Sequence, residues 1–200
     1  APSAGVLALL REAHMPVVLI DPRDSDLLEQ GQHNISCVVS DREGGVVQAM
    51  RHLIQRGHRR IVFLSAQSNR RRFVGYLRAL EEGGLARDER LIKLWPSETE
   101  SLAAGRLNSY RPTQERGEAD ERMFRSDYFM VGRLKGYRAT QELLADSVPF
   151  TAIQAGSDFT AAGAIDALRE VGIRVPEDVA VVGFDDVDSL KASPFREPFL

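Results

Sequence analysis

Polar and charged side chains recur directly after the short apolar runs of this sequence, where they could bind a small ligand. They are Asp21, Ser68, Arg72, Ser157 and Asp185, with Asp158 and Asp186 beside them. A guanidinium offers a fork of donors and a carboxylate offers acceptors, so each can engage two neighbouring hydroxyl groups or the edge of a ring. This chemistry suits a sugar, a polyol or a nucleobase.

Short runs rich in β-branched residues alternate with amphipathic stretches along the chain. The runs are Pro16–Ile20, Ser36–Ser40, Ile61–Ser65, Leu91–Trp95, Thr151–Ala155 and Val179–Phe184. Runs that are apolar throughout are typical of parallel strands covered by helices on both faces. Binding groups gather at the carboxyl ends of such strands, which is where the polar side chains above are found. The sequence therefore predicts an α/β fold with an open, doubly wound parallel sheet.

Three helices are marked between these strands, and one polar stretch is not. The first helix follows Ser40–Glu43, which matches a capping box with Ser40 as the N-cap. The second ends at Gly83, and the third runs from Asp158 to the turn at Gly172. The stretch Pro96–Asp127 is rich in Arg and Glu and has no clear periodicity. We predict that it is an irregular, exposed insertion outside the site, because it offers little apolar surface to offset the entropy of ordering.

Composition excludes several classes of function. The formal net charge is −3, with 26 basic and 29 acidic side chains interspersed, so these residues alone carry no polybasic footprint for DNA or an anionic membrane. Cys37 is the single cysteine, which excludes a disulfide within the chain and fits a reducing cytoplasm. The four histidines lack a ligand-like spacing. We therefore predict no metal site and no cofactor.

Signatures of catalysis and of export are absent as well. The sequence has no Gly-x-Ser-x-Gly elbow, no Gly-x-Gly-x-x-Gly fingerprint, no phosphate loop and no His-Glu-x-x-His. No apolar run approaches the ~18 residues of a spanning helix, and no basic region precedes a long apolar stretch. The prediction is a cytoplasmic protein that is not an enzyme.

Several motifs, taken in order and spacing, carry a family resemblance over nearly the whole chain. They include His52-Leu-Ile-Gln-Arg-Gly57-His58, Arg72-x-x-Gly75-Tyr76, Ser157-Asp158-x-x-Ala161-x-Gly163-Ala164 and Val175-Pro-Glu-Asp-Val-Ala-Val-Val-Gly-Phe-Asp185-Asp186. The sequence thereby resembles the lactose-repressor/galactose-repressor (LacI/GalR) family of bacterial transcription regulators. The resemblance implies two doubly wound parallel-sheet subdomains of the type I periplasmic-binding-protein-like fold, with an effector cleft between them.

The resemblance also suggests how the chain is divided. Residues 1–58 would be a partial amino-terminal subdomain, so that this subdomain is incomplete. Residues 59–188 would be the carboxyl-terminal subdomain, with the insertion at about 96–127, and residues 189–200 would begin the return crossing. The DNA-binding headpiece of the family has no counterpart in these residues.

Site residues follow from the resemblance position by position. Arg72 takes the family's effector-binding arginine position and Asp185 the first aspartate of the carboxyl-terminal motif, so we expect both to face one cleft. A solvated arginine within Arg70–Arg72 is the alternative for Arg72. Ser157 stands where many relatives have asparagine. Tyr128 is the expected aromatic platform for the ligand, with core packing as the alternative, whereas Asp158 is interpreted as a cap or first-turn acid.

The resemblance implies an effector-sensing domain for a sugar, polyol or nucleoside-like ligand, acting on operator DNA through a headpiece outside this chain. We also expect a homodimer, because paired half-sites require a two-fold assembly. The helix after Asp158 would contribute, since Ala161, Ala162 and Ala164 cannot all face one narrow core stripe and at least one should point outward. A periplasmic sugar-binding protein of a transport system is the alternative. A longer sequence with a helix-turn-helix or a signal peptide would distinguish the two.

Overall fold

The computed structural model describes residues 16–21, 35–96 and 120–187, with the side chains of helix α6 described from Val131 onward. The helices and strands in these ranges are β1 (Val17–Ile20), β2 (Ile35–Val38), α3 (Arg42–Gln55), β3 (Ile61–Ala66), α4 (Arg70–Glu82), the 3-10 turn η1 (Glu89–Leu91), β4 (Ile92–Trp95), α6 (Asp120–Ala145), β5 (Ala152–Ala155), α7 (Asp158–Glu170) and β6 (Ala180–Val182). Each of the predicted strands is confirmed within a few residues.

The chain forms two compact units, Ala1–Asp41 and Arg42–Leu200. Helix α3, which the sequence analysis assigned to the amino-terminal subdomain, belongs to the second unit because its apolar face packs on the sheet that β3 begins. The division of the chain into family subdomains, with its boundary at residues 58–59, stays a prediction.

The first unit contains a two-stranded parallel sheet. Strand β1 pairs with β2 from Val17 opposite Ile35 to Ile20 opposite Val38. Beyond the strands, the Ser40 hydroxyl donates to Asp21 Oδ1 at 2.9 Å. The predicted capping box is therefore wrong: α3 begins at Arg42, and the hydroxyl that was to cap it is hydrogen-bonded to the Asp21 carboxylate instead.

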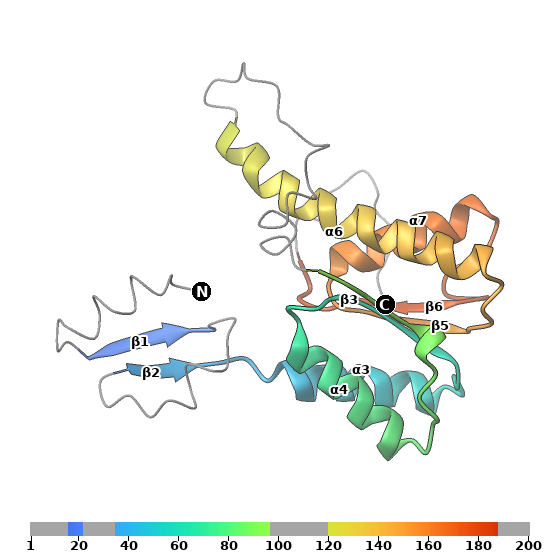
Figure 1. Ribbon diagram of the computed structural model, residues 1–200, viewed down its shortest axis with the longest axis horizontal. Helices are drawn as coiled ribbons and strands as arrows, with labels where there is room; N and C mark the ends of the chain where they lie inside the picture. The colour runs from blue at the N-terminus through green and yellow to red at the C-terminus, as the bar shows by residue number, and fades with distance from the viewer. Residues whose placement is uncertain (1–15, 22–34, 97–119, 188–200) are drawn as a thin grey trace. The chain divides into compact units, whose positions relative to one another are not determined.

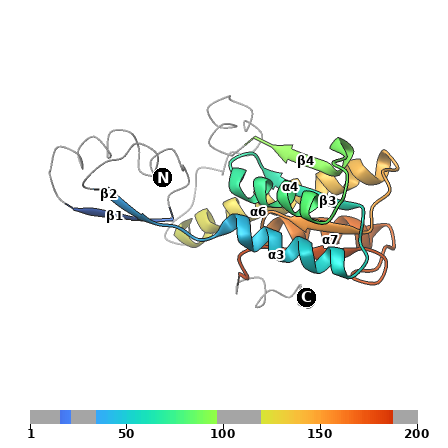
Figure 2. The same cartoon turned by 90° about the horizontal axis from the view of Figure 1, so that it is seen from below.

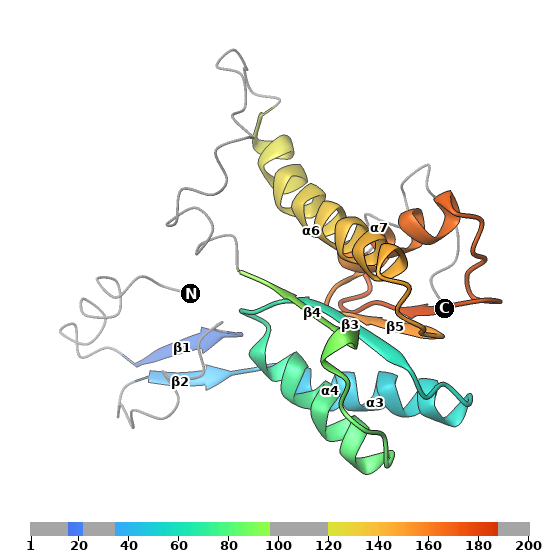
Figure 3. The same ribbon diagram turned by 45° about the vertical axis from the view of Figure 1, so that its right-hand side comes forward.

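The second unit is a parallel sheet with helices on both faces. Its strand order is β4-β3-β5-β6, and every neighbouring pair is parallel. Helices α3 and α4 lie on one face and α6 and α7 on the other (Figure 1). Seen from below, α3 and α4 lie side by side (Figure 2), and α6 and α7 do the same on the opposite face (Figure 3). The predicted doubly wound α/β architecture is confirmed for this unit.

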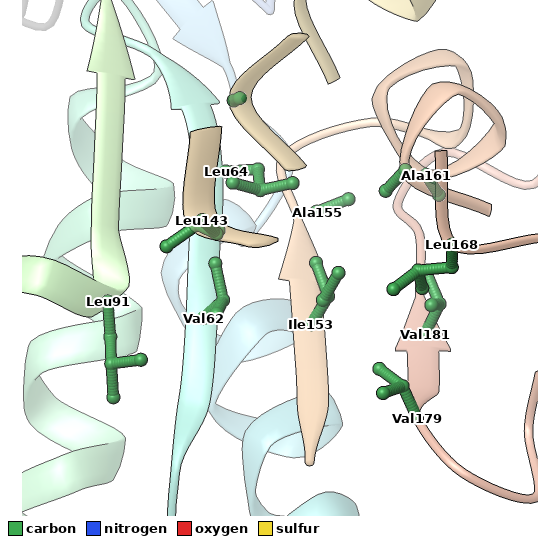
Figure 4. Packing of buried hydrophobic residues seen from close by; sticks show 12 residues of the cluster. Val62, Leu64, Leu91, Leu143, Ile153, Ala155, Ala161, Leu168, Val179 and Val181 are labelled. Atoms are coloured by element: carbon green, nitrogen blue, oxygen red, sulfur yellow. The ribbon is translucent and has the colours of Figure 1, made fainter. Parts of the chain in front are cut away.

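Alternation along β3 builds a core on each face of this sheet. Ile61 and Phe63 pack toward α3 and α4, whereas Val62 and Leu64 pack toward α6 and α7. All four side chains are at most 1% exposed. Figure 4 shows the second of these cores, in which side chains of β3, β5 and β6 lie beside Leu143 of α6 and Leu168 of α7. A strand buried on both faces must be apolar throughout, which explains its sequence.

Two expectations about the helices on this face are wrong. Of the stretch Pro96–Asp127, predicted to be irregular, residues 120–127 are the first turns of α6, and residues 97–119 lie outside the described part of the chain. The alanines of α7 do not face outward: Ala161 and Ala164 are 0% exposed and Ala162 is 8% exposed within the single chain. Ala161 and Ala164 pack in the core beneath α7, and α6 lies directly beside α7 on the same face of the sheet. The two helices approach so closely that a Cβ on Gly136 would meet the Thr160 carbonyl oxygen.

One buried polar group in the sheet gives a stability prediction. Gln154 of β5 is 0% exposed, and its Oε1 has no hydrogen-bond partner among the described residues. Its register neighbours are Phe63 and Val182. Since an unmet buried acceptor costs free energy, Gln154→Leu is expected to raise the free energy of unfolding by about 1 kcal/mol, measured by urea denaturation.

The matched control is Gln154→Ala, which removes the same polar atoms but leaves a cavity. It is expected to lower the free energy of unfolding by about 2 kcal/mol. If Gln154→Leu lowered the free energy of unfolding as Gln154→Ala does, the side-chain amide of Gln154 would have to make a favourable interaction, contrary to the prediction.

Candidate functional site

Arg72 of α4 and Asp185 after β6 form an ion pair in the second unit. Arg72 Nη2 lies 2.7 Å from Asp185 Oδ1, and Nη1 lies 3.5 Å from Oδ2. Nη1 also donates to the Gly156 carbonyl oxygen, and the guanidinium carbon is 4.0 Å from the centroid of the Phe184 ring. The guanidinium is thus held by a carboxylate, a backbone oxygen and an aromatic face.

The two side chains of the pair differ in exposure. The Arg72 side chain is 9% exposed, whereas that of Asp185 is 42% exposed. The interpretation of Arg72 as a solvated arginine in a basic run is therefore wrong: among Arg70–Arg72, the third arginine is the one that turns inward. Helical spacing explains this, because Arg72, Tyr76 and Ala79 share the buried face of α4. A buried cation consequently supports an accessible carboxylate.

Local structure brings α4, β3 and β5 close enough for this contact. Asn69 precedes α4 and its Nδ2 donates to the Ser65 hydroxyl at 3.1 Å. The Gly156 amide donates to the Leu64 carbonyl oxygen at 2.7 Å, and a Cβ on Gly156 would collide with the Ser65 hydroxyl. Glycine at this position lets the carboxyl end of β5 pass close to β3. The Gly156 carbonyl can then accept from the arginine in the first turn of α4.

The loop that carries Asp185 has an unusual backbone. Asp185 has φ 100° and Asp186 has φ 49°, and left-handed conformations are uncommon for residues with a side chain. Such a conformation persists only where the surrounding structure enforces it, and it is concentrated at functional sites. The loop therefore keeps the Asp185 carboxylate in a position that an unstrained turn would not provide.

Ser157 and Asp158 at the start of α7 lie against this loop. Ser157 is the N-cap of α7, since its Oγ accepts from the Thr160 amide at 3.3 Å. Asp158 is the first helical residue, and its amide donates to the Phe184 carbonyl oxygen at 3.0 Å. Burial raises the pKa of the Asp158 carboxyl, and the negative charges of Asp185 and Asp186 raise it further.

The structure brings together two of the predicted site residues, Arg72 and Asp185. Ser157 caps the helix beside their loop, and Ser68 is exposed in the turn between β3 and α4. Asp21 belongs to the first unit, where its carboxylate accepts from Ser40. Tyr128 is in α6, with its side chain outside the described residues. The cleft between two subdomains, and the ligand contacts of all these residues, stay predictions.

Sequence reasoning missed two groups that hold the guanidinium, Phe184 and the Gly156 carbonyl. For Phe184 a signal existed: Val182 and Phe184 are two residues apart at the end of β6, so they point to the same face of the sheet. Both pack with the core on the α3 and α4 side, which is the face that Arg72 reaches. For Gly156 the signal was weaker, a single glycine after a buried strand.

Within residues 16–21, 35–96 and 120–187, no group of three or more His, Cys, Asp or Glu side chains is arranged to hold a metal ion. In the same part of the chain, no helix combines the length and apolarity that crossing a bilayer requires.

Comparison with known proteins identifies the family. Residues 50–194 match the model of the periplasmic binding protein-like domain. The chain is 31% identical over 190 residues to the HTH-type transcriptional repressor PurR of Erwinia tasmaniensis, covering 93% of this chain and 44% of that protein. The chain belongs to the LacI/GalR family, as a periplasmic binding protein-like domain. The resemblance stated from the motifs is confirmed.

Other relatives of this LacI/GalR domain agree. The HTH-type transcriptional regulator GalR of Escherichia coli K12 is 34% identical over 155 residues, which cover 76% of this chain and 35% of that protein. A transcription regulator from Lactobacillus plantarum shares the fold with a TM-score of 0.68 at 23% identity, over 96% of this chain and 59% of that one. The chain thus spans less than half the length of PurR and of GalR. PurR and GalR are transcription regulators rather than enzymes or transport proteins, which favours the regulator over the periplasmic alternative.

Proposed function

We propose that this LacI/GalR domain is the effector-sensing part of a transcription regulator and binds a small polar ligand at the Arg72–Asp185 pair. The pair itself is the observation that carries the proposal. It joins the carboxyl end of β6 to the first turn of α4, which is the edge of a parallel sheet where ligands bind. It also combines a buried, preorganised cation with a carboxylate that is 42% exposed.

The chemistry of the pair favours a ligand with hydroxyl or ring N–H donors. The exposed carboxylate has acceptor capacity beyond its contacts with Arg72, because two carboxylate oxygens offer about four lone-pair sites. Because Arg72 is already hydrogen-bonded to the Asp185 carboxylate, the orientation of the carboxylate is fixed before the ligand binds. Less side-chain conformational entropy is therefore lost on binding. A sugar, a polyol or a nucleoside-like molecule meets these requirements. Ser68, Ser157, Asp21 and the Tyr128 platform remain proposed contacts of that ligand.

Regulation would act through partners outside this chain. We expect operator DNA to be bound by a headpiece that these residues do not include, in a cytoplasmic homodimer. The dimer contact assigned to the α7 alanines is no longer proposed, because Ala161, Ala162 and Ala164 are buried within one chain. Any two-fold contact must use other surfaces of the protein.

A thermal-shift screen of the full-length regulator against sugars, polyols and nucleosides tests the proposal. A ligand at ~100 times its dissociation constant adds ~2.7 kcal/mol of stability, so a true effector should raise the melting temperature clearly. Asp185→Asn should abolish that shift. As the matched control, Asp178→Asn alters an exposed aspartate that pairs with Arg174 at 2.6 Å and should leave the shift unchanged.

Two results would contradict the proposal. One is a complete library without any stabilising compound. The other is a compound whose stabilising effect is equal in the wild-type regulator and in Asp185→Asn, because binding would then occur away from the pair.

A further inference from the structure

Asp158 makes direct contacts with the loop that carries Asp185. Its Oδ2 accepts from the Val187 amide at 2.7 Å, and its own amide donates to the Phe184 carbonyl oxygen at 3.0 Å. The two contacts bracket Asp185 and Asp186, one on each side. Since Asp158 is only 8% exposed, water competes little with these hydrogen bonds.

The amino-terminal end of the loop is fitted to the same side chain. A Cβ on Gly183 would collide with Asp158 Oδ1 and lie 3.2 Å from Asp158 Cα. The loop therefore passes directly over the Asp158 side chain, at a distance that only glycine allows. Two consecutive residues of the loop have positive φ, a conformation that costs free energy and needs such fixed contacts to persist.

What Asp158 supplies to the loop is an acceptor rather than a charge. Burial raises the pKa of its carboxyl, the Val187 amide lowers it, and the negative charges of Asp185 and Asp186 raise it, with a net shift upward. The folded protein thus disfavours the ionised form, whereas an ordinary first-turn acid gains from its charge at the helix N-terminus. The contact with Val187 requires only an oxygen that can accept a hydrogen bond.

We propose that Asp158 is a positioning residue, which fixes the Gly183–Val187 loop through its acceptor oxygen and so sets the Asp185 carboxylate against Arg72. This proposal rests on the proposed function in one respect, because the pair is taken to be the ligand-binding group. The start of α7 would then be connected to the ligand site through the contacts of Asp158 with Phe184 and Val187.

Selective ¹⁵N labelling of arginine in the full-length regulator tests this proposal without any effector. The Arg72 side-chain resonance is assigned with Arg72→Lys, and Asp185→Asn gives its position when the ion pair is lost. Asp158→Ala is expected to move the resonance to that position. Asp158→Asn keeps an acceptor oxygen and is expected to restore the wild-type position. Asp166→Ala, the matched control on α7, removes a carboxylate that pairs with Arg133 at 2.6 Å and should leave the resonance unmoved.

Gly183→Ala provides a second route if Asp158→Ala fails to fold. Its methyl group would collide with the Asp158 side chain and push the loop away from it, so it should move the Arg72 resonance as Asp158→Ala does. A wild-type resonance in a folded Asp158→Ala or Gly183→Ala protein would overturn the proposal, and so would loss of the wild-type position in Asp158→Asn. A failed effector screen would overturn the proposed function and leave these spectra unchanged.

The pH dependence of stability gives an independent readout. Because the folded-state pKa of Asp158 is raised, its favourable contribution is complete below the unfolded-state pKa and is lost as the pH rises through the folded-state value. The urea midpoint of the wild-type protein should therefore fall relative to that of Asp158→Asn as the pH rises above about 4, the ordinary pKa of an aspartate. A wild-type midpoint that instead rises relative to Asp158→Asn over this range would overturn the acceptor role.

Discussion

Replacement of Arg72 by alanine is expected to weaken effector binding at least roughly 30-fold, a loss of about 2 kcal/mol or more. The substitution removes Nη2, which donates to Asp185, and Nη1, which donates to Asp185 and to the Gly156 carbonyl oxygen. The carboxylate then loses its fixed orientation as well as its counter-charge. Isothermal titration calorimetry, with an effector from the screen, measures the change directly.

The fold should survive this substitution. Asp185 is 42% exposed, so water can solvate it once the arginine is gone, and the loss of unfolding free energy should stay near 2 kcal/mol. Arg72→Lys keeps the charge but not the fork, and should bind weakly as well. The control Arg78→Ala, on the same helix, removes exposed pairs with Glu43 and Glu82 and should leave affinity unchanged. Unaltered affinity in Arg72→Ala would refute the assignment of the site.

The strands were predictable because burial on both faces of a parallel sheet leaves a direct trace in the sequence. Strand β3 is apolar from Ile61 to Leu64, and its side chains alternate between two cores. The pairing of Arg72 with Asp185 spans 113 residues and could not be read from local pattern alone. The family motifs, together with the rule that ligand groups gather at the carboxyl ends of strands, predicted that both residues face one cleft, but not that they form an ion pair.

Other features depend on contacts that no local pattern encodes. The sequence shows an aspartate at the start of α7, which suits any helix, but not that the Val187 amide would be its partner. Likewise, Ser40–Glu43 has the sequence of a capping box, yet Asp21, 19 residues away, accepts the Ser40 hydroxyl instead. In both cases a tertiary hydrogen bond determines the role of a side chain whose local sequence suggests another.

The prediction that one α7 alanine faces outward came from counting the faces of an isolated helix. In the structure Ala161, Ala162 and Ala164 are all buried, and α6 lies beside α7 on the same face of the sheet. Small residues on both helices then serve the crossing itself. A Cβ on Gly163 would collide with the Arg133 carbonyl oxygen, and one on Gly136 would collide with the Thr160 carbonyl oxygen. The crossing thus brings backbone against backbone.

Gly136→Ala is therefore expected to lower the free energy of unfolding by about 3 kcal/mol, because its methyl group must push a carbonyl of α7 away and open the core beneath. The control is Gly132→Ala, one turn earlier on α6, where a Cβ would lie 3.3 Å from Phe159 Cβ. That contact requires a shift of a few tenths of an ångström, and alanine gains about 1 kcal/mol of helix propensity, so its stability should stay close to that of the wild type. Urea denaturation of both variants decides the matter: equal midpoints would mean that the helices can separate at Gly136 without cost, contrary to this prediction.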